Sequence, residues 1–184
     1  MRVVKKPEER KAEMVEAAAK LFVAQGFVRT SVAEIVAAVD VAKGLFYYYF
    51  TTKDDMVKAV VEGLSAHLGA QMHEIAASEA TGAEKLSAVL SHPVWQELAR
   101  TPLFKNLCME QHTALYTDAA MRMTEHIAPA LTLIARQAQL EAGHEALYTE
   151  DIVRVMCHGL AQLARRGELD ENKASVLVHQ ILNV

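Results

Sequence analysis

The feature that most constrains the fold is a pair of short helical stretches separated by a tight turn, within residues 31–50. Ser31 is followed three residues later by Glu34, a capping box that predicts the start of the first stretch. Asp40 stands where the chain must turn, and Asp tolerates the left-handed backbone conformation. Two short helices joined by such a turn are typical of a helix-turn-helix, whose second helix enters the DNA major groove.

The second stretch, residues 42–50, contains three consecutive tyrosines flanked by phenylalanines, "LFYYYF". Because successive residues of a helix are about 100° apart, Phe46 and Phe50 share one face. Leu45 and Tyr48 then lie on the opposite face with Gly44, whose small size lets a partner approach the backbone closely. We therefore expect the phenylalanines to anchor this helix and the outward face to contact a partner.

The rest of the chain also has a helical pattern. Ala, Leu, Glu, Lys and Met dominate, and the alternation typical of strands is absent. A first helix is expected from Pro7 to a terminating Gly26, and Pro129 should kink or restart a long helix over residues 117–141. We predict an all-α fold with a helix-turn-helix domain at 1–52 and a larger helical domain at 53–184.

Composition excludes several classes of protein. Of 184 residues, 52% are hydrophobic and 23% charged, which indicates a folded chain rather than a disordered one. No apolar run is long enough to span a membrane, and the charged N-terminus lacks the apolar segment of a secretory signal. We therefore expect a cytoplasmic protein with no membrane partner. Cys108 and Cys157 do not form a disulfide-framework pattern, so both are expected to be thiols.

Charge is unevenly distributed along the chain. The net charge is −4, yet the first 55 residues carry 9 Lys and Arg against 8 Asp and Glu, and the acidic excess lies in the remainder. The first eleven residues form a basic N-terminal arm. Such an arm is more often a solvated tail than a reader of a DNA groove, and both interpretations stay open.

Two stretches of the N-terminal part of the chain resemble a known family. Residues 30–56, "TSVAEIVAAVDVAKGLFYYYFTTKDDM", resemble the DNA-binding domain of the TetR family of bacterial transcriptional regulators. Residues 14–27, "MVEAAAKLFVAQGF", resemble that family's first helix. The resemblance implies a homodimer that binds a palindromic operator, usually represses, and is released by a small molecule bound in its larger helical domain.

The resemblance also assigns DNA-contacting positions. Bases would be contacted from the start of the second short helix, and phosphates by residues around it; Lys suits phosphate or guanine, and a leucine or tyrosine edge suits the thymine methyl. The base-contacting set is Lys43, Gly44, Leu45, Tyr47 and Tyr48, and the phosphate-contacting set is Thr30, Ser31, Tyr49 and Lys53. Asp40 replaces the family's usual turn glycine, and Ala42 replaces a common Ser or Thr cap.

Two further sites follow from the resemblance. A Met-containing cavity would suit an apolar or aromatic effector. Its candidate lining is Trp95, Phe104, Cys108, Gln111, His112, Tyr116, Met123 and His126.

The last two helices are amphipathic and would form a four-helix bundle with a second subunit, although packing within one chain is the alternative. The candidate dimer interface is Ile152, Val155, Met156, Gly159, Leu163, Leu177, Val178 and Ile181.

Cys108 and His112 lie four residues apart, on one face of a helix, which leaves a metal- or redox-responsive regulator as an alternative. The chain contains no Cys-x-x-Cys and no His-Glu-x-x-His, so we expect no cofactor and no bound metal. A helical enzyme, or an interaction protein without DNA activity, is a more remote possibility. Because no nucleophile, base and orienting group can be assembled from the sequence, we predict that the protein is not an enzyme.

Overall fold

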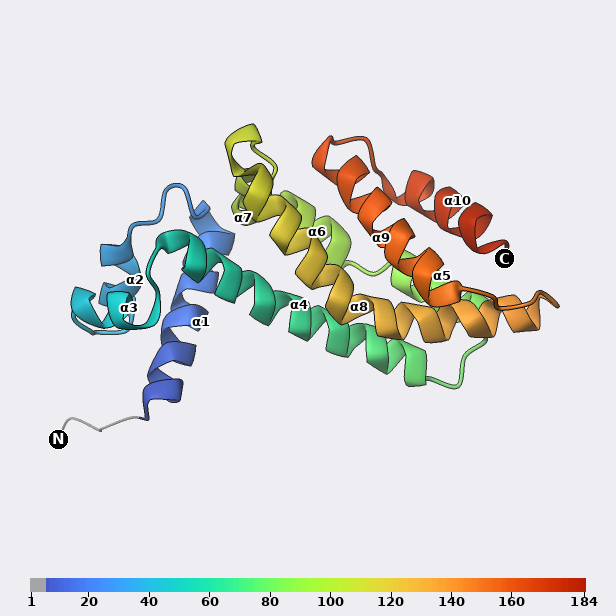
Figure 1. Ribbon diagram of the computed structural model, residues 1–184, viewed down its shortest axis with the longest axis horizontal. Helices are drawn as coiled ribbons and strands as arrows, with labels where there is room; N and C mark the ends of the chain where they lie inside the picture. Colours follow the sequence, from blue (N-terminus) through green and yellow to red (C-terminus); the bar gives the residue numbers. More distant parts are fainter. Residues whose placement is uncertain (1–5) are drawn as a thin grey trace. The chain divides into compact units, whose positions relative to one another are not determined.

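The computed structural model describes residues 6–184, and every regular element in this range is a helix (Figure 1). The all-α prediction is therefore confirmed. No helix of the described part of the chain is long and apolar enough to cross a membrane. The elements are α1 (Pro7–Gln25), α2 (Val32–Ala38), α3 (Lys43–Tyr49), α4 (Lys53–Ala77), α5 (Gly82–Leu90), α6 (Val94–Arg100), α7 (Pro102–Leu107), the 3₁₀ turn η1 (Glu110–His112), α8 (Thr113–Glu141), α9 (Thr149–Arg165) and α10 (Glu171–Leu182).

The chain forms two compact units. The first comprises the described residues up to Gly63 together with Gln96–Tyr116, and the second comprises Leu64–Trp95 together with Thr117–Val184. The first unit therefore contains the helix-turn-helix and also a later segment of the chain. The predicted division at residues 52 and 53 was a division by function, with DNA binding before it and effector binding after it. The two compact units do not test that division, which stays a prediction.

The helix starts follow the capping signals in the sequence. Ser31 caps α2, because its backbone N–H donates to Oε2 of Glu34 at 2.7 Å and its hydroxyl accepts from the Glu34 N–H at 3.2 Å. Thr81 and Glu84 form the same reciprocal pair at the start of α5. These hydrogen bonds hold the pKa of both Glu carboxyls below its ordinary value.

Of the two outcomes expected at Pro129, a kink or a restart of the helix, the restart was wrong. α8 continues through Pro129 as one helix of 29 residues, and it starts at Thr113 rather than near residue 117. An interior proline costs a helix about 3 kcal/mol. The proline ring is exposed, while Ala128, Ala130 and Leu131 beside it are buried in the core of the second unit. Tertiary packing therefore offsets the local penalty.

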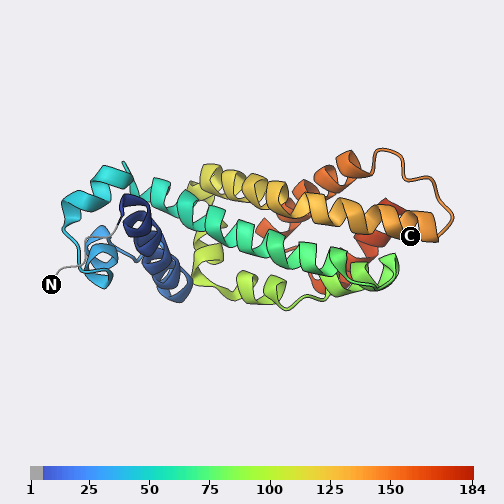
Figure 2. The same ribbon diagram turned by 90° about the horizontal axis from the view of Figure 1, so that it is seen from below.

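The second unit is built around the C-terminal part of α4 and the long helix α8, which run alongside each other (Figure 2). α10 packs against both α9 and α5. The core of the second unit contains Leu68, Met72, Leu86, Ile134, Val153, Val178 and Leu182. A buried lysine ties the end of α4 to α8: Nζ of Lys85 donates to the Ala76 carbonyl at 2.9 Å and to Oε1 of Gln137 at 2.8 Å.

Two glycines of α4 provide a matched test of this packing. A Cβ on Gly69 would lie 2.6 Å from the backbone oxygen of His126, whereas a Cβ on Gly63 would meet open space. We expect Gly69→Ala to lower the free energy of unfolding by about 1–3 kcal/mol, because the backbones must separate. Gly63→Ala should raise it by up to about 1 kcal/mol through helix propensity. Urea unfolding followed by circular dichroism measures both, and equal effects would contradict the close approach of α4 and α8.

Candidate nucleic-acid interface

Helix α3 is the second helix of the helix-turn-helix and is called the recognition helix below. Its two phenylalanines anchor it, as the sequence predicts. Phe46 is fully buried and Phe50 nearly so, with ring centroids 5.6 Å apart. Tyr48 is 75% exposed and Tyr47 52% exposed, while Tyr49 is half-buried. The phenylalanines therefore hold the helix to the unit, and two tyrosine rings project into solvent.

The first turn of α3 adds a cation to this outward face. Lys43 and Gly44 are exposed, and Leu45 is half-buried. Nζ of Lys43 lies 6.0 Å from the centroid of the Tyr47 ring, within the range of a cation–π interaction. Among the described residues, a Cβ on Gly44 would meet no atom within 4 Å outside its own stretch of helix, so its backbone is open to a partner. The five residues predicted to contact bases thus share one short helix, four of them exposed.

The turn before α3 is made by Asp40, whose φ of +51° places it in the left-handed region expected from the sequence. The Val41 N–H donates to the Val36 carbonyl at 3.0 Å and closes the turn. Ala42 is the N-cap of α3, and its methyl side chain cannot accept a capping hydrogen bond from the backbone. The turn is therefore held by the backbone and by the conformational tolerance of one aspartate.

Thr30 corrects one part of the predicted phosphate-contacting set. Its side chain is 1% exposed, and its hydroxyl donates to the Gly26 carbonyl at 2.8 Å. Nε2 of Gln25 donates to the same hydroxyl oxygen at 3.2 Å. This hydroxyl shapes the turn between α1 and α2, and a phosphate contact by it does not fit its burial. Ser31, the next residue, is exposed at the start of α2.

Lys53 lies close to the same helix start. Its Nζ donates to the backbone carbonyl of Thr30 at 3.3 Å, which places the ammonium beside Ser31. Positive charge next to the first N–H groups of a helix favours an anion. The arrangement is compatible with the predicted phosphate contacts of Ser31 and Lys53, which stay predictions.

One basic residue was missing from the predicted DNA-contacting set. Lys11 is exposed on α1, and its Nζ lies 5.7 Å from the centroid of the Phe50 ring, at the C-terminal end of α3. Its ammonium therefore flanks the recognition helix. The sequence signal was the basic N-terminal arm, of which Met1–Lys5 lie outside the described residues.

The eight residues predicted to line an effector cavity divide between the two units. Trp95 and Met123 pack against the core of the second unit, and His126 belongs to the same unit. Nε1 of Trp95 donates to the Val89 carbonyl at 2.7 Å. The other five belong to the first unit: Phe104, Cys108, Gln111, His112 and Tyr116.

His112 has structural partners in the first unit. Its Nδ1 donates to the Asn106 carbonyl at 2.7 Å, and its ring centroid lies 4.9 Å from that of Phe27. Phe104 and Tyr116 pack edge to face, with ring centroids 6.2 Å apart. These residues serve packing within the first unit, and their role in binding an effector stays a prediction.

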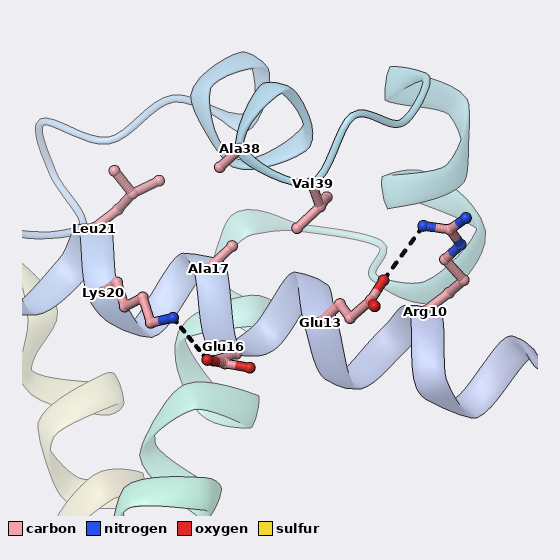
Figure 3. A pocket seen from close by; sticks show the side chains of 8 residues that line it. All are labelled: Arg10, Glu13, Glu16, Ala17, Lys20, Leu21, Ala38 and Val39. Atoms are coloured by element: carbon pink, nitrogen blue, oxygen red, sulfur yellow. Dashed lines mark hydrogen bonds and ion pairs between the residues drawn. The ribbon is translucent and has the colours of Figure 1, made fainter. Parts of the chain in front are cut away.

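A shallow hollow of about 480 Å³ lies between α1 and the end of α2 (Figure 3). Its charged side chains pair with each other: Arg10 with Glu13 at 3.3 Å, and Lys20 with Glu16 at 2.7 Å. Opposite charges that neutralise one another do not make a site for a phosphate. The remaining lining residues are Ala17, Leu21, Ala38 and Val39, none of which belongs to the predicted effector set.

Two residues predicted at the dimer interface belong to the core instead. Met156 and Val178 are buried within the second unit, on the inward faces of α9 and α10. Periodicity identified the amphipathic stripe but not which edge of it faces inward. Val155, Gly159 and Ile181 are exposed; Ile152, Leu163 and Leu177 are half-buried.

The two cysteines differ in their surroundings. Cys157 is buried, and its burial raises the pKa of its thiol to about 11, so it stays protonated and unreactive at neutral pH. Cys108 is half-buried in the first unit. Among residues 6–184, no three His, Cys, Asp or Glu side chains are grouped so that they could hold a metal ion.

Two short helices joined by a tight turn, with an exposed basic and aromatic face on the second, define a helix-turn-helix DNA-binding protein. Residues 14–60 match the model of "Bacterial regulatory proteins, tetR family". The chain is 24% identical to a probable transcriptional regulator, ArpR of Pseudomonas putida, over 95% of this chain and 77% of ArpR. It is 30% identical to the transcriptional repressor KstR2 of Mycobacterium tuberculosis, over 48% of this chain and 44% of KstR2.

The fold as a whole is also similar to solved structures. A crystal structure of RolR in complex with resorcinol superposes with a TM-score of 0.73 at 17% identity, covering 96% of this chain and 87% of RolR. The chain belongs to the TetR family of bacterial transcriptional regulators. It is thus a transcriptional regulator and not an enzyme, as predicted.

The charge and backbone conformation of Asp40 can be tested separately. Asp40→Asn keeps a residue that tolerates φ of +51° and removes a negative charge beside α3. We expect DNA binding at low salt to tighten by about two- to fivefold, with no change in stability. Asp40→Ala removes the same charge but should cost about 1–2 kcal/mol of stability. Fluorescence anisotropy with duplex DNA and urea unfolding measure these effects; equal stability of the two variants would contradict a strained turn.

Proposed function

We propose that the protein is a homodimeric repressor that binds a palindromic operator through α3 and releases it when a small apolar or aromatic molecule binds. The observation that carries this proposal is the outward face of α3, where Lys43, Tyr47 and Tyr48 are exposed on a helix anchored by buried phenylalanines. An exposed aromatic pair on a seven-residue helix is costly unless a partner covers it. The site of action would be the cytoplasm, where the operator lies.

DNA recognition would divide between bases and phosphates. α3 would lie in the major groove, with Lys43 facing a guanine and Tyr48 or Leu45 facing a thymine methyl. Ser31, the N-cap of α2, and Lys53, whose ammonium lies beside it from the start of α4, would hold a phosphate. Lys11, beside Phe50 at the C-terminal end of α3, would hold another. Phosphate contacts fix the register of the helix, and the base contacts read the sequence.

Dimerisation would use the exposed faces of α9 and α10, which pack together in the second unit (Figure 1). Val155 is 73% exposed, and Val176 and Ile181 on α10 are also exposed, while Gly159 leaves its face open for close approach. Two such helices from each copy would form a four-helix bundle. The two recognition helices would then read half-sites about one turn of DNA apart.

The name of one relative supports repression, and one protein of similar fold supports binding of a small molecule. KstR2 is named a transcriptional repressor, and RolR, which shares the fold, binds the aromatic diol resorcinol. In this chain, Trp95 and Met123 at the edge of the second unit's core offer aromatic and polarisable surface for a ligand of that kind. Binding would favour a conformation in which the recognition helices no longer match the two half-sites.

Salt-dependent binding of duplex DNA tests this function. A repressor that neutralises several phosphates should bind the DNA upstream of its own gene tightly, and the logarithm of its affinity should fall linearly with the logarithm of salt concentration. Binding to that duplex and to sequences selected from a random pool can be measured by gel shift. Failure to bind any duplex at low salt would overturn the proposal.

Two substitutions separate the proposed roles of the residues that face DNA. Lys53→Ala should weaken binding to all duplexes alike and reduce the salt slope by about 0.9 for each phosphate that the variant no longer neutralises. Tyr48→Ala should instead change the order of preference among sequences, by about 1–3 kcal/mol at the contacted base pair. Competition gel shifts with single-base variants of the preferred site measure both. An equal loss on every sequence for both variants would refute this division of roles.

The dimer interface can be tested with a charge on α9. Val155→Glu would bury a carboxylate between the two copies, so we expect the dimer to dissociate at least about tenfold more readily. Val28→Glu is the matched control, because Val28 is also exposed but lies in the first unit, between α1 and α2. Sedimentation equilibrium measures the subunit dissociation constant. A dimer unaffected by Val155→Glu, or weakened equally by both variants, would place the interface elsewhere.

A further inference from the structure

The first unit contains a segment that is remote in sequence from its helix-turn-helix. Gln96–Tyr116 belongs to this unit, and α7 within it packs against α1. None of the predicted DNA-contacting residues lies in this segment. Its contacts with the turn between α1 and α2 are nevertheless specific.

The side chain of Asn106 is fitted to that turn. Its Oδ1 accepts a hydrogen bond from the backbone N–H of Val28 at 3.0 Å. A Cβ on Gly26 would overlap Oδ1 of Asn106, and Gly26 has φ of +83°, a conformation that side chains other than glycine rarely adopt. Glycine at this position therefore both makes the turn and admits the amide of Asn106.

His112 holds the backbone of Asn106 in place. Its Nδ1 donates to the Asn106 backbone carbonyl, and its ring packs on Phe27, the residue between Gly26 and Val28. The turn is thus contacted at three consecutive residues. The Asn106 side chain bonds the turn, while His112 holds both the Asn106 backbone and the aromatic ring of the turn.

The same turn determines where α2 begins. The buried Thr30 hydroxyl donates to the Gly26 carbonyl, and Nζ of Lys53 donates to the Thr30 carbonyl. Ser31 then caps α2, which packs directly against α3. A displacement of residues 26–28 would therefore move the start of α2 and the phosphate-facing groups beside it.

We propose that Asn106 is a positioning residue for DNA binding: it fixes the turn between α1 and α2, and through that turn the placement of Ser31, Lys53 and the recognition helix. This inference rests on the proposed DNA-binding function and extends it to a residue that does not touch DNA. Loss of the Asn106 amide should weaken operator binding although every DNA-contacting group is retained.

The test compares Asn106→Ala with the conservative Asn106→Asp, whose carboxylate can still accept the Val28 hydrogen bond. The probe is the duplex that the unmodified protein selects from a random pool. We expect Asn106→Ala to bind it about five- to tenfold more weakly, the effect of one hydrogen bond. The salt slope should fall by at most about 0.9, the effect of one phosphate contact, because the turn positions one proposed phosphate-binding cation, Lys53. Asn106→Asp should bind within about twofold of the unmodified protein.

Ser91→Ala is the matched control. Its hydroxyl donates to the Ser87 carbonyl at 2.8 Å, so the variant loses one side-chain-to-backbone hydrogen bond in the second unit. Urea unfolding of all variants separates stability from positioning, and Ser91→Ala should lose stability without losing DNA affinity.

The inference is overturned if Asn106→Ala binds as tightly as the unmodified protein, if Asn106→Asp fails to restore binding, or if Ser91→Ala weakens binding equally. The urea experiment shows whether Asn106→Ala is unfolded. If it is, the DNA affinity of Asn106→Asp tests the proposal instead. These results assume that the unmodified protein binds duplex DNA. If it binds none, the proposed function fails instead, so the two failures are distinguishable.

Discussion

The burial of Phe46 is the interaction on which the proposed DNA-reading surface depends. A seven-residue helix is not stable alone in water, because nucleating a helix costs more than so few hydrogen bonds return. Burying one phenylalanine contributes about 1.5–3 kcal/mol, and Phe50 adds a second anchor at the end of α3. Since these rings hold the helix in place, Tyr47 and Tyr48 are not needed for packing and can face solvent.

Backbone conformation at two turns completes this arrangement. Gly26 and Asp40 both have positive φ, and they precede α2 and α3 respectively. Gly26 ends α1, and the N–H at this position donates to the Phe22 carbonyl at 2.9 Å. Aspartate at the second turn adopts the required conformation but introduces a negative charge next to the proposed DNA surface. The fold of the helix-turn-helix and its affinity for DNA therefore make different demands on residue 40.

Local sequence signals predicted much of the fold and of the DNA surface. A capping box gave the start of α2, and helical periodicity separated the buried Phe46 from the exposed Tyr48. Features set by tertiary packing were not predictable in this way. The burial of Thr30 depends on the turn around it, the inward side of Met156 depends on neighbouring helices, and α8 passes through Pro129 because the core holds it. Asn106 meets Val28 across 78 residues, which no local pattern encodes.

The most direct test of operator binding by two copies of α3 is selection of bound duplexes from a random DNA pool by the protein. We expect enrichment of an inverted repeat whose half-sites are centred about one helical turn apart, because two copies of α3 must enter the major groove on one face of the DNA. Binding to that sequence should weaken steeply with salt. Absence of any enriched sequence, or enrichment of a single unrepeated site, would contradict binding of a palindromic operator by a dimer.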